Sequence, residues 1–159
     1  MTLEPILEVC HLSKSFGTHQ VLRDVNFTVH PGDVTSILGS SGSGKSTLLR
    51  CLNLLEVPSS GHIYFNDVDI TDKKVDIDLH RRKMGMVFQH FNLFPHMTVQ
   101  KNITLAPVQL KLKTQEEADK QAMELLERIG LADKANEYPN MLSGGQKQRI
   151  AIVRSLAMH

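Results

Sequence analysis

The stretch Gly39-Ser40-Ser41-Gly42-Ser43-Gly44-Lys45-Ser46 decides the fold of this chain. It fits the pattern G-x-x-x-x-G-K-[ST], in which backbone N–H groups surround phosphate oxygens. Glycine is needed where the backbone must approach those oxygens closely or adopt a positive φ angle, and Gly39, Gly42 and Gly44 supply that freedom. The pattern therefore predicts a site for a nucleoside triphosphate.

The segments on either side of this loop have the expected character. Residues 33–38 (Asp-Val-Thr-Ser-Ile-Leu) are typical of a short buried strand, and residues 45–55 carry apolar side chains at helical spacing. A helix that begins at the loop adds unpaired N–H groups and partial positive charge beside the phosphates. A chance glycine- and serine-rich turn is the alternative, and the strand–loop–helix context disfavours it.

The side chains of the loop suggest individual roles. Lys45 is expected to bridge the β- and γ-phosphates, Ser46 to offer a hydroxyl to Mg²⁺, and Thr47 to lie beside the α-phosphate. The predicted phosphate-contacting residues are Gly39, Ser40, Ser41, Gly42, Ser43, Gly44, Lys45, Ser46 and Thr47.

A second glycine motif, Leu142-Ser143-Gly144-Gly145-Gln146, lies far downstream. Ser143 and Gln146 have the spacing of a capping box, and the residues that follow favour a helix. The motif thus presents another helix N-terminus that Gly144 and Gly145 leave sterically bare. It has no lysine placed like Lys45, so we do not expect it to hold a nucleotide alone.

Together the two motifs resemble those of ATP-binding-cassette (ABC) ATPases, in which the second is the signature motif. Phe16 matches the aromatic residue that stacks on adenine in that family, and Gln89 matches the Q-loop glutamine that touches Mg²⁺ and senses the membrane partner. The segment Phe91–Thr98 is similar to the one that follows the Q-loop in polar amino-acid importers.

This resemblance implies an α/β fold of the P-loop NTPase type, with an antiparallel β layer and a helical subdomain over about residues 98–141. It implies ATP and Mg²⁺ as cofactors, with Ser46 and Gln89 at the metal. Two copies would pair head to tail, so that Ser143, Gly144, Gly145 and Gln146 of one subunit contact the nucleotide of the other.

The resemblance also implies a role, a location in the cell and partners for the protein. The chain would be the ATP-binding subunit of a polar amino-acid importer, peripheral to the cytoplasmic face of a bacterial inner membrane. Its partners would be permease subunits and, indirectly, a solute-binding protein, but no nucleic acid. Alternatives are a lipoprotein-releasing or peptide-exporting ABC ATPase, or a nucleotide-binding fragment without turnover.

Later landmarks of the family have no match in this chain. They are an apolar strand that ends in Asp-Glu, which carries the catalytic base, and a histidine that contacts the γ-phosphate. Gln89 is then the only matched catalytic residue. We expect the 159 residues, as the front two-thirds of a cassette, to be inactive alone. The strand Val34–Leu38 would also have an open apolar edge that favours self-association.

Composition and pattern agree with one soluble-type domain over residues 1–159. The chain has 18 basic and 17 acidic residues, a net charge of +1, so charge gives no argument for nucleic acid or anionic membrane as a partner. Strand-like runs at 6–9, 25–29 and 61–65 predict the antiparallel layer, and 33–55 with 84–89 predict the nucleotide core. We expect the charged stretch 67–83 to be a solvated loop.

The stretch from residue 98 to 141 is predicted to be helical. Within it, Thr114 and Glu117 form a capping box, and Gly130 is a plausible helix stop.

Overall fold

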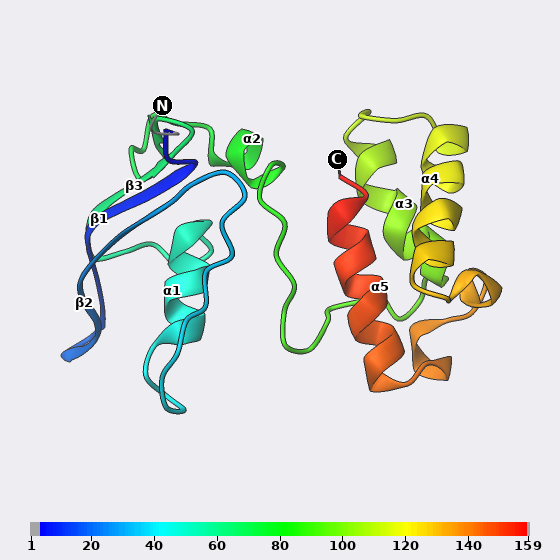
Figure 1. The fold of residues 1–159 in the computed structure, drawn as a ribbon, viewed down its shortest axis with the longest axis horizontal. Helices are drawn as coiled ribbons and strands as arrows, with labels where there is room; N and C mark the ends of the chain where they lie inside the picture. Colours follow the sequence, from blue (N-terminus) through cyan, green and yellow to red (C-terminus); the bar gives the residue numbers. More distant parts are fainter. Residues whose placement is uncertain (1–3, 159) are drawn as a thin grey trace. The chain divides into compact units, whose positions relative to one another are not determined.

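The computed structural model describes residues 4–158 and divides the chain into two compact units, which meet in sequence between Arg81 and Arg82. We call them the N-terminal unit and the C-terminal unit and describe each by itself. The first holds the strands with two helices, and the second holds the remaining helices (Figure 1).

The N-terminal unit is built on a four-stranded antiparallel sheet in the order β2-β1-β3-β4. Its strands are β1 (Leu7–Phe16), β2 (His19–Val29), β3 (Ser60–Phe65) and β4 (Val68–Asp69). The antiparallel layer predicted from sequence is confirmed, with strands that extend beyond the predicted runs. Two helices complete the unit, α1 (Lys45–Leu52) and α2 (Ile77–Arg81).

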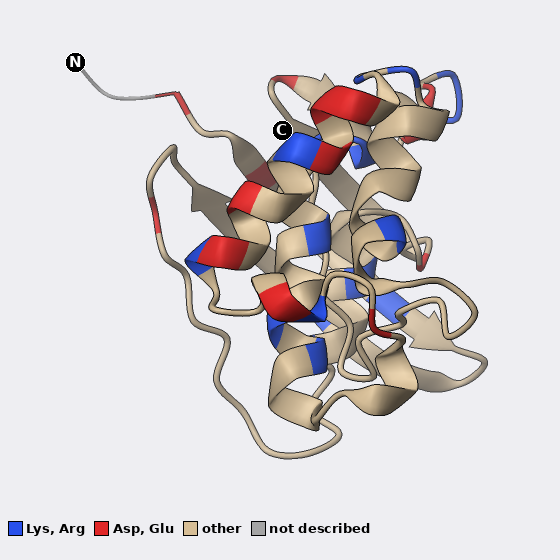
Figure 2. Ribbon diagram, turned by 90° about the vertical axis from the view of Figure 1, so that its right-hand side faces the viewer, with Lys and Arg blue, Asp and Glu red and all other residues tan. Residues whose placement is uncertain are grey.

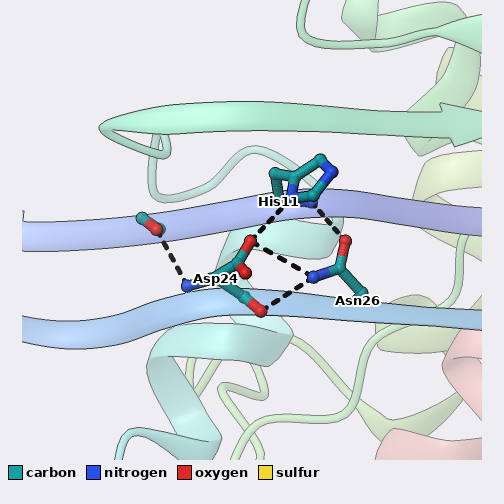
Figure 3. Close-up of polar contacts among 4 residues, drawn as sticks. His11, Asp24 and Asn26 are labelled. Carbon is teal, nitrogen blue, oxygen red and sulfur yellow. Dashed lines mark hydrogen bonds and ion pairs between the residues drawn. The ribbon is translucent and has the colours of Figure 1, made fainter.

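A bulged region with two successive register shifts interrupts the pairing of β1 with β2. His11 lies at one shift and Asp24 at the other, with φ angles of +51° and +46° (Figure 3). The Asp24 carboxylate lies 2.7 Å from His11 Nδ1, and Asn26 accepts a hydrogen bond from the His11 backbone N–H. The pKa of the Asp24 carboxylate is lowered, chiefly by its hydrogen bond with His11 and further by the one from Asn26. These side chains therefore replace the ladder bonds that the bulge removes.

One predicted strand is absent from the described residues. Residues 33–38 form no ladder, and Val34 and Leu38 are 94% and 91% exposed, although we predicted a buried strand there. Residues 84–89, which we predicted to be part of the nucleotide core, are also irregular. A strand exists only where another backbone pairs with it, and no described segment pairs with either run. The two parts of the predicted nucleotide core also fall in different units.

The charged stretch 67–83 is more ordered than the solvated loop we predicted. It contains β4 and α2, and Ile70 is 1% exposed. Arg81 of α2 donates hydrogen bonds to the backbone carbonyls of Asn53 and Leu54, which ties this stretch to the end of α1. Charge content alone did not reveal these contacts.

The C-terminal unit contains α3 (Val99–Gln109), α4 (Gln115–Arg128) and α5 (Gly144–Leu156), with short 3₁₀ turns at Ala132–Lys134 and Pro139–Met141. Helices thus occupy the stretch predicted to be helical. The three helices bury one apolar core, formed by Val99, Ile103, Ala122, Leu126, Leu131, Ala135, Leu142, Ile150, Val153 and Ala157. Of these helices, α4 carries both acidic and basic residues, whereas α3 and α5 carry basic ones only (Figure 2).

The predicted helix ends of α4 and α5 are confirmed. Thr114 and Glu117 form a capping box at the start of α4, and Ser143 and Gln146 form one at the start of α5. Hydrogen bonds from the backbone N–H and the hydroxyl of Thr114 lower the pKa of Glu117. Gly130, with φ +66°, follows the end of α4 as expected for a left-handed stop.

Asn102 of α3 is a buried side chain with several hydrogen bonds to backbone. It is 1% exposed; its amide donates to the carbonyls of Phe94, Met97 and Thr98, and its oxygen accepts from the Phe94 N–H. One side chain of α3 thereby satisfies four backbone groups of the segment before it. Such a bond set fixes the segment because buried polar groups are costly when unpaired.

We predict that Asn102→Ala lowers the free energy of unfolding by about 2–3 kcal/mol, because it leaves buried backbone groups without partners. Urea unfolding followed by circular dichroism measures this change. The exposed Asn136→Ala is the control and should stay within about 0.5 kcal/mol of the unaltered chain. Equal effects of the two substitutions would contradict the role assigned to Asn102.

Candidate nucleotide-binding site

The loop before α1 is closed by its own lysine. The Lys45 ammonium donates to the backbone carbonyl of Gly39 at 2.9 Å and to that of Ser40 at 2.7 Å, and it lies 3.5 Å from Ser43 Oγ. The loop thus curls around the amine. An ammonium in this position can exchange carbonyl oxygens for phosphate oxygens without leaving the loop, since both are hydrogen-bond acceptors.

The glycines of the loop leave room where a phosphate would lie. Gly42 has φ +81°, and a Cβ there would meet no heavy atom within 4 Å, so one side of the loop is open. A Cβ on Gly39 would lie 2.5 Å from Ser43 Oγ, so the loop closes tightly at its other side. Glycine is therefore favoured by backbone angle at Gly42, whereas a side chain at Gly39 would displace the Ser43 hydroxyl.

The start of α1 is free to receive an anion. Its N-cap residue, Gly44, has φ +94° and no side chain with which to satisfy the first N–H groups of the helix. A Cβ on Gly44 would lie 2.9 Å from Val21 Cγ1 and 3.2 Å from Leu22 Cδ2, so the loop packs against β2. Ser46 is exposed and Thr47 half-buried on the first turn. The first N–H groups of α1 and the hydroxyls of Ser46 and Thr47 are donors that suit a chain of phosphates. That they bind ATP stays a prediction.

Phe16, the predicted adenine-stacking residue, is 49% exposed at the end of β1. The Lys14 ammonium lies 4.8 Å from the centre of its ring. That amine also pairs with Glu56 at 2.6 Å and donates to the Val57 carbonyl at 2.6 Å. Lysine therefore covers part of the ring, and the remaining exposed surface is available for stacking.

The second motif differs from the first in how its helix begins. Ser143 Oγ accepts from the Gln146 N–H at 3.3 Å, and Gln146 Oε1 accepts from the Ser143 N–H at 2.8 Å. A Cβ on Gly144 or Gly145 would meet nothing within 4 Å. The α5 terminus is thus already capped, but its glycine face is open, and the Ser143 hydroxyl proton can still be donated.

Gln89 is exposed in a turn of the C-terminal unit. The residues just after it have unusual backbone angles, with φ +61° at Phe91 and +48° at Asn92. The phosphate loop lies in the N-terminal unit, whereas Gln89 and the second motif lie in the C-terminal unit. The roles of Gln89 at Mg²⁺ and of Ser46 as a metal ligand therefore remain predictions.

Sequence reasoning missed two residues that shape this region. Arg154 of α5 donates to the carbonyls of Asn92 and Phe91, and Asn102 holds the segment that follows. Neither residue stands in a local pattern that predicts its partners. A polar residue at a core-facing helical position was the only signal for Asn102, and we found none for Arg154.

The family model described as "ABC transporter" matches residues 22–159. The chain belongs to this family. Among the described residues of this ABC chain, none of the helices is both long and apolar enough to cross a membrane.

Curated relatives of the ABC chain include two amino-acid transport proteins. It is 55% identical over 147 residues to the glutamine transport ATP-binding protein GlnQ of Geobacillus stearothermophilus, covering 92% of this chain and 61% of the relative. It is 53% identical over 154 residues to the arginine transport ATP-binding protein ArtM of Bacillus subtilis, covering 97% of this chain and 64% of the relative. The chain thus spans about three-fifths of the length of the curated relatives it matches.

A solved structure agrees with the fold. A dimeric structure of the ATP-binding cassette MJ0796, in a post-hydrolysis state with ADP and Pi, has a TM-score of 0.83 and 36% identity. The match covers 96% of this chain and 69% of that one. The ABC-type α/β fold predicted from sequence is confirmed.

We predict that Gly44→Ala lowers the free energy of unfolding by roughly 2–3 kcal/mol, because it adds a clash with β2 to a strained backbone. Gly17→Ala is the matched control, since Gly17 also has a positive φ but open space around its Cβ. Its cost should be about 1 kcal/mol. Urea unfolding measures both, and equal costs would contradict the packing of this loop against β2.

Proposed function

We propose that this chain is the nucleotide-binding part of an ABC importer subunit that couples ATP binding and hydrolysis to uptake of polar amino acids. The geometry of Lys45 carries the proposal: its amine is held by loop carbonyls at a helix start that has no side-chain cap. The names of the two amino-acid transport relatives support the solute class. Uptake of glutamine- or arginine-like solutes is the form that fits them best.

The residues have separable roles in this proposal. Gly39–Thr47 would bind the triphosphate, with Lys45 holding the β- and γ-phosphates and Ser46 holding Mg²⁺, which would supply charge neutralisation in phosphoryl transfer. Phe16 would stack on adenine. Gln89 would couple Mg²⁺ and the attacking water to the permease. Ser143, Gly144, Gly145 and Gln146 hold the γ-phosphate of a second copy.

The proposed assembly is a head-to-tail dimer bound to permease subunits at the cytoplasmic face of a bacterial inner membrane. A solute-binding protein would act through the permease. The dimeric cassette structure supports pairing of two copies. The charge balance of the chain gives no electrostatic reason for a nucleic-acid partner.

A second candidate is a nucleotide-binding chain that does not turn over. The contacts of Lys45 with the loop carbonyls account for nucleotide binding and do not by themselves supply a base for the attacking water. Both candidates share the same phosphate loop. They differ only in phosphate release.

We predict that the 159-residue chain binds a fluorescent ATP analogue in the presence of Mg²⁺ and that Lys45→Ala weakens binding at least about tenfold, since a charge-assisted bond to phosphate is lost. The measurement is a fluorescence titration. Lys73→Ala is the control because Lys73 is an exposed lysine of the same unit, outside the loop.

Phosphate release in the same samples separates the two candidates. Release that depends on Mg²⁺ and is lost in Lys45→Ala supports the hydrolytic proposal for the chain itself. Binding without release supports the second candidate. Equal nucleotide affinity of Lys45→Ala and Lys73→Ala would contradict both.

A further inference from the structure

Arg154, in the last turn of α5, binds the segment that follows Gln89. Arg154 Nη1 donates to the Asn92 carbonyl at 2.7 Å, and Nη2 donates to the Phe91 carbonyl at 3.2 Å. Its guanidinium also lies 5.8 Å from the centre of the Phe94 ring. One half-buried side chain thus binds two consecutive carbonyls and faces an aromatic ring, and the planar fork of the guanidinium lets a separate Nη donate to each carbonyl.

The backbone that Arg154 holds is strained. Phe91 and Asn92 both have positive φ angles, which cost free energy in residues with a side chain. Such a conformation persists only where its surroundings impose it. The two hydrogen bonds from Arg154 point at the carbonyls of these two residues, so Arg154 supplies that constraint.

The neighbour of Arg154 on α5 constrains the segment before Gln89. A Cβ added to Gly85 would collide with Ser155 Oγ, so backbone and helix approach closely there. Arg154 therefore binds the turn that carries Gln89 on one side, at Phe91 and Asn92, and Ser155 lies close to the backbone on its other side, at Gly85. All these residues belong to the C-terminal unit.

We propose that Arg154 is a positioning residue that clamps the Gln89 turn to α5, so that Gln89 and the second motif at the start of the same helix move as one body. The catalytic meaning of the clamp rests on the proposed function, whereas the clamp itself does not. Because α5 is continuous from Gly144 to Leu156, a displacement of the Gln89 turn reaches Ser143 along a stiff rod.

A simpler reading is that Arg154 only complements the negative end of the α5 dipole. In that case any cation at this position would serve. The clamp instead requires two donors in a fixed plane and the contact with Phe94. Arg154→Lys separates these readings because it keeps the charge and loses the fork, and Arg154→Met keeps most of the apolar stem and loses both.

Hydrogen exchange read by mass spectrometry tests the clamp on the 159-residue chain. The N–H groups of Phe91, Asn92 and Phe94 are bonded in the structure, to the Phe88 carbonyl, the His90 carbonyl and Asn102 Oδ1, so this peptide reports local opening. We expect Arg154→Lys and Arg154→Met to speed exchange there about tenfold or more. Exchange in α3 and α4 should stay unchanged.

Arg149→Gln is the matched control for this experiment. Arg149 is also on α5 and donates to a backbone carbonyl, that of Ile129, but it does not touch the Gln89 turn. It should leave exchange over residues 88–95 unchanged. Normal exchange there in Arg154→Lys, or a rise spread equally over α3, α4 and α5, would overturn the proposal.

A fluorescence readout and a paired variant provide an independent check. The chain has no tryptophan, so His90→Trp places a single reporter next to Gln89. Its anisotropy should fall on Arg154→Met and stay unchanged on Arg149→Gln; no fall with Arg154→Met would overturn the clamp. Gly85→Ala should likewise loosen the turn, and adding Ser155→Ala should restore it by removing the colliding oxygen. If binding of the ATP analogue fails in the unaltered chain, the proposed function falls, and these readouts still decide the clamp.

Discussion

An ammonium group carries three donors, and in this protein the Lys45 amine finds acceptors in the loop that precedes it. Its bonds to the carbonyls of Gly39 and Ser40 hold the loop in a curl above the start of α1. Gly44 lets the chain turn into the helix with a positive φ and lets the loop pack against β2. The position of the phosphate site relative to the antiparallel sheet depends on these contacts.

The two glycine motifs both begin a helix, but they differ in how the first N–H groups of that helix are bonded. The α1 terminus has no side-chain cap and leaves its first N–H groups for a ligand. The α5 terminus is capped by Ser143 and Gln146 and exposes only its glycine face. An uncapped terminus with a lysine suits a primary phosphate site, and a capped one suits a surface that closes over a nucleotide held elsewhere.

The helix α5 also organises its own unit. Arg149 binds the carbonyl of Ile129 at the end of α4, and Arg154 binds the carbonyls after Gln89. Two arginines of one helix thus satisfy backbone groups of segments distant in sequence. Asn102 of α3 does the same for the segment that begins at Phe94. Long-range contacts of this kind fix irregular backbone that has no ladder or helix of its own.

The sequence predicted correctly those features that depend only on residues near one another in the chain. The capping boxes at Thr114 and Ser143 and the stop at Gly130 depend on neighbouring residues, and the structure confirms them. The prediction of a strand at 33–38 was wrong, because a strand needs a second backbone to pair with and an apolar run does not specify one. The contacts of Arg154 were missed because they join residues that no spacing rule connects. Site roles that involve the nucleotide remain predictions.

The most direct test of this account is a crystal structure of the chain with Mg²⁺ and a non-hydrolysable ATP analogue. The account predicts that the Lys45 amine leaves the carbonyls of Gly39 and Ser40 and lies within ~3 Å of β- and γ-phosphate oxygens. The N–H groups at the start of α1 should then point at the same phosphates. An analogue bound elsewhere, with Lys45 still on its loop carbonyls, would contradict it.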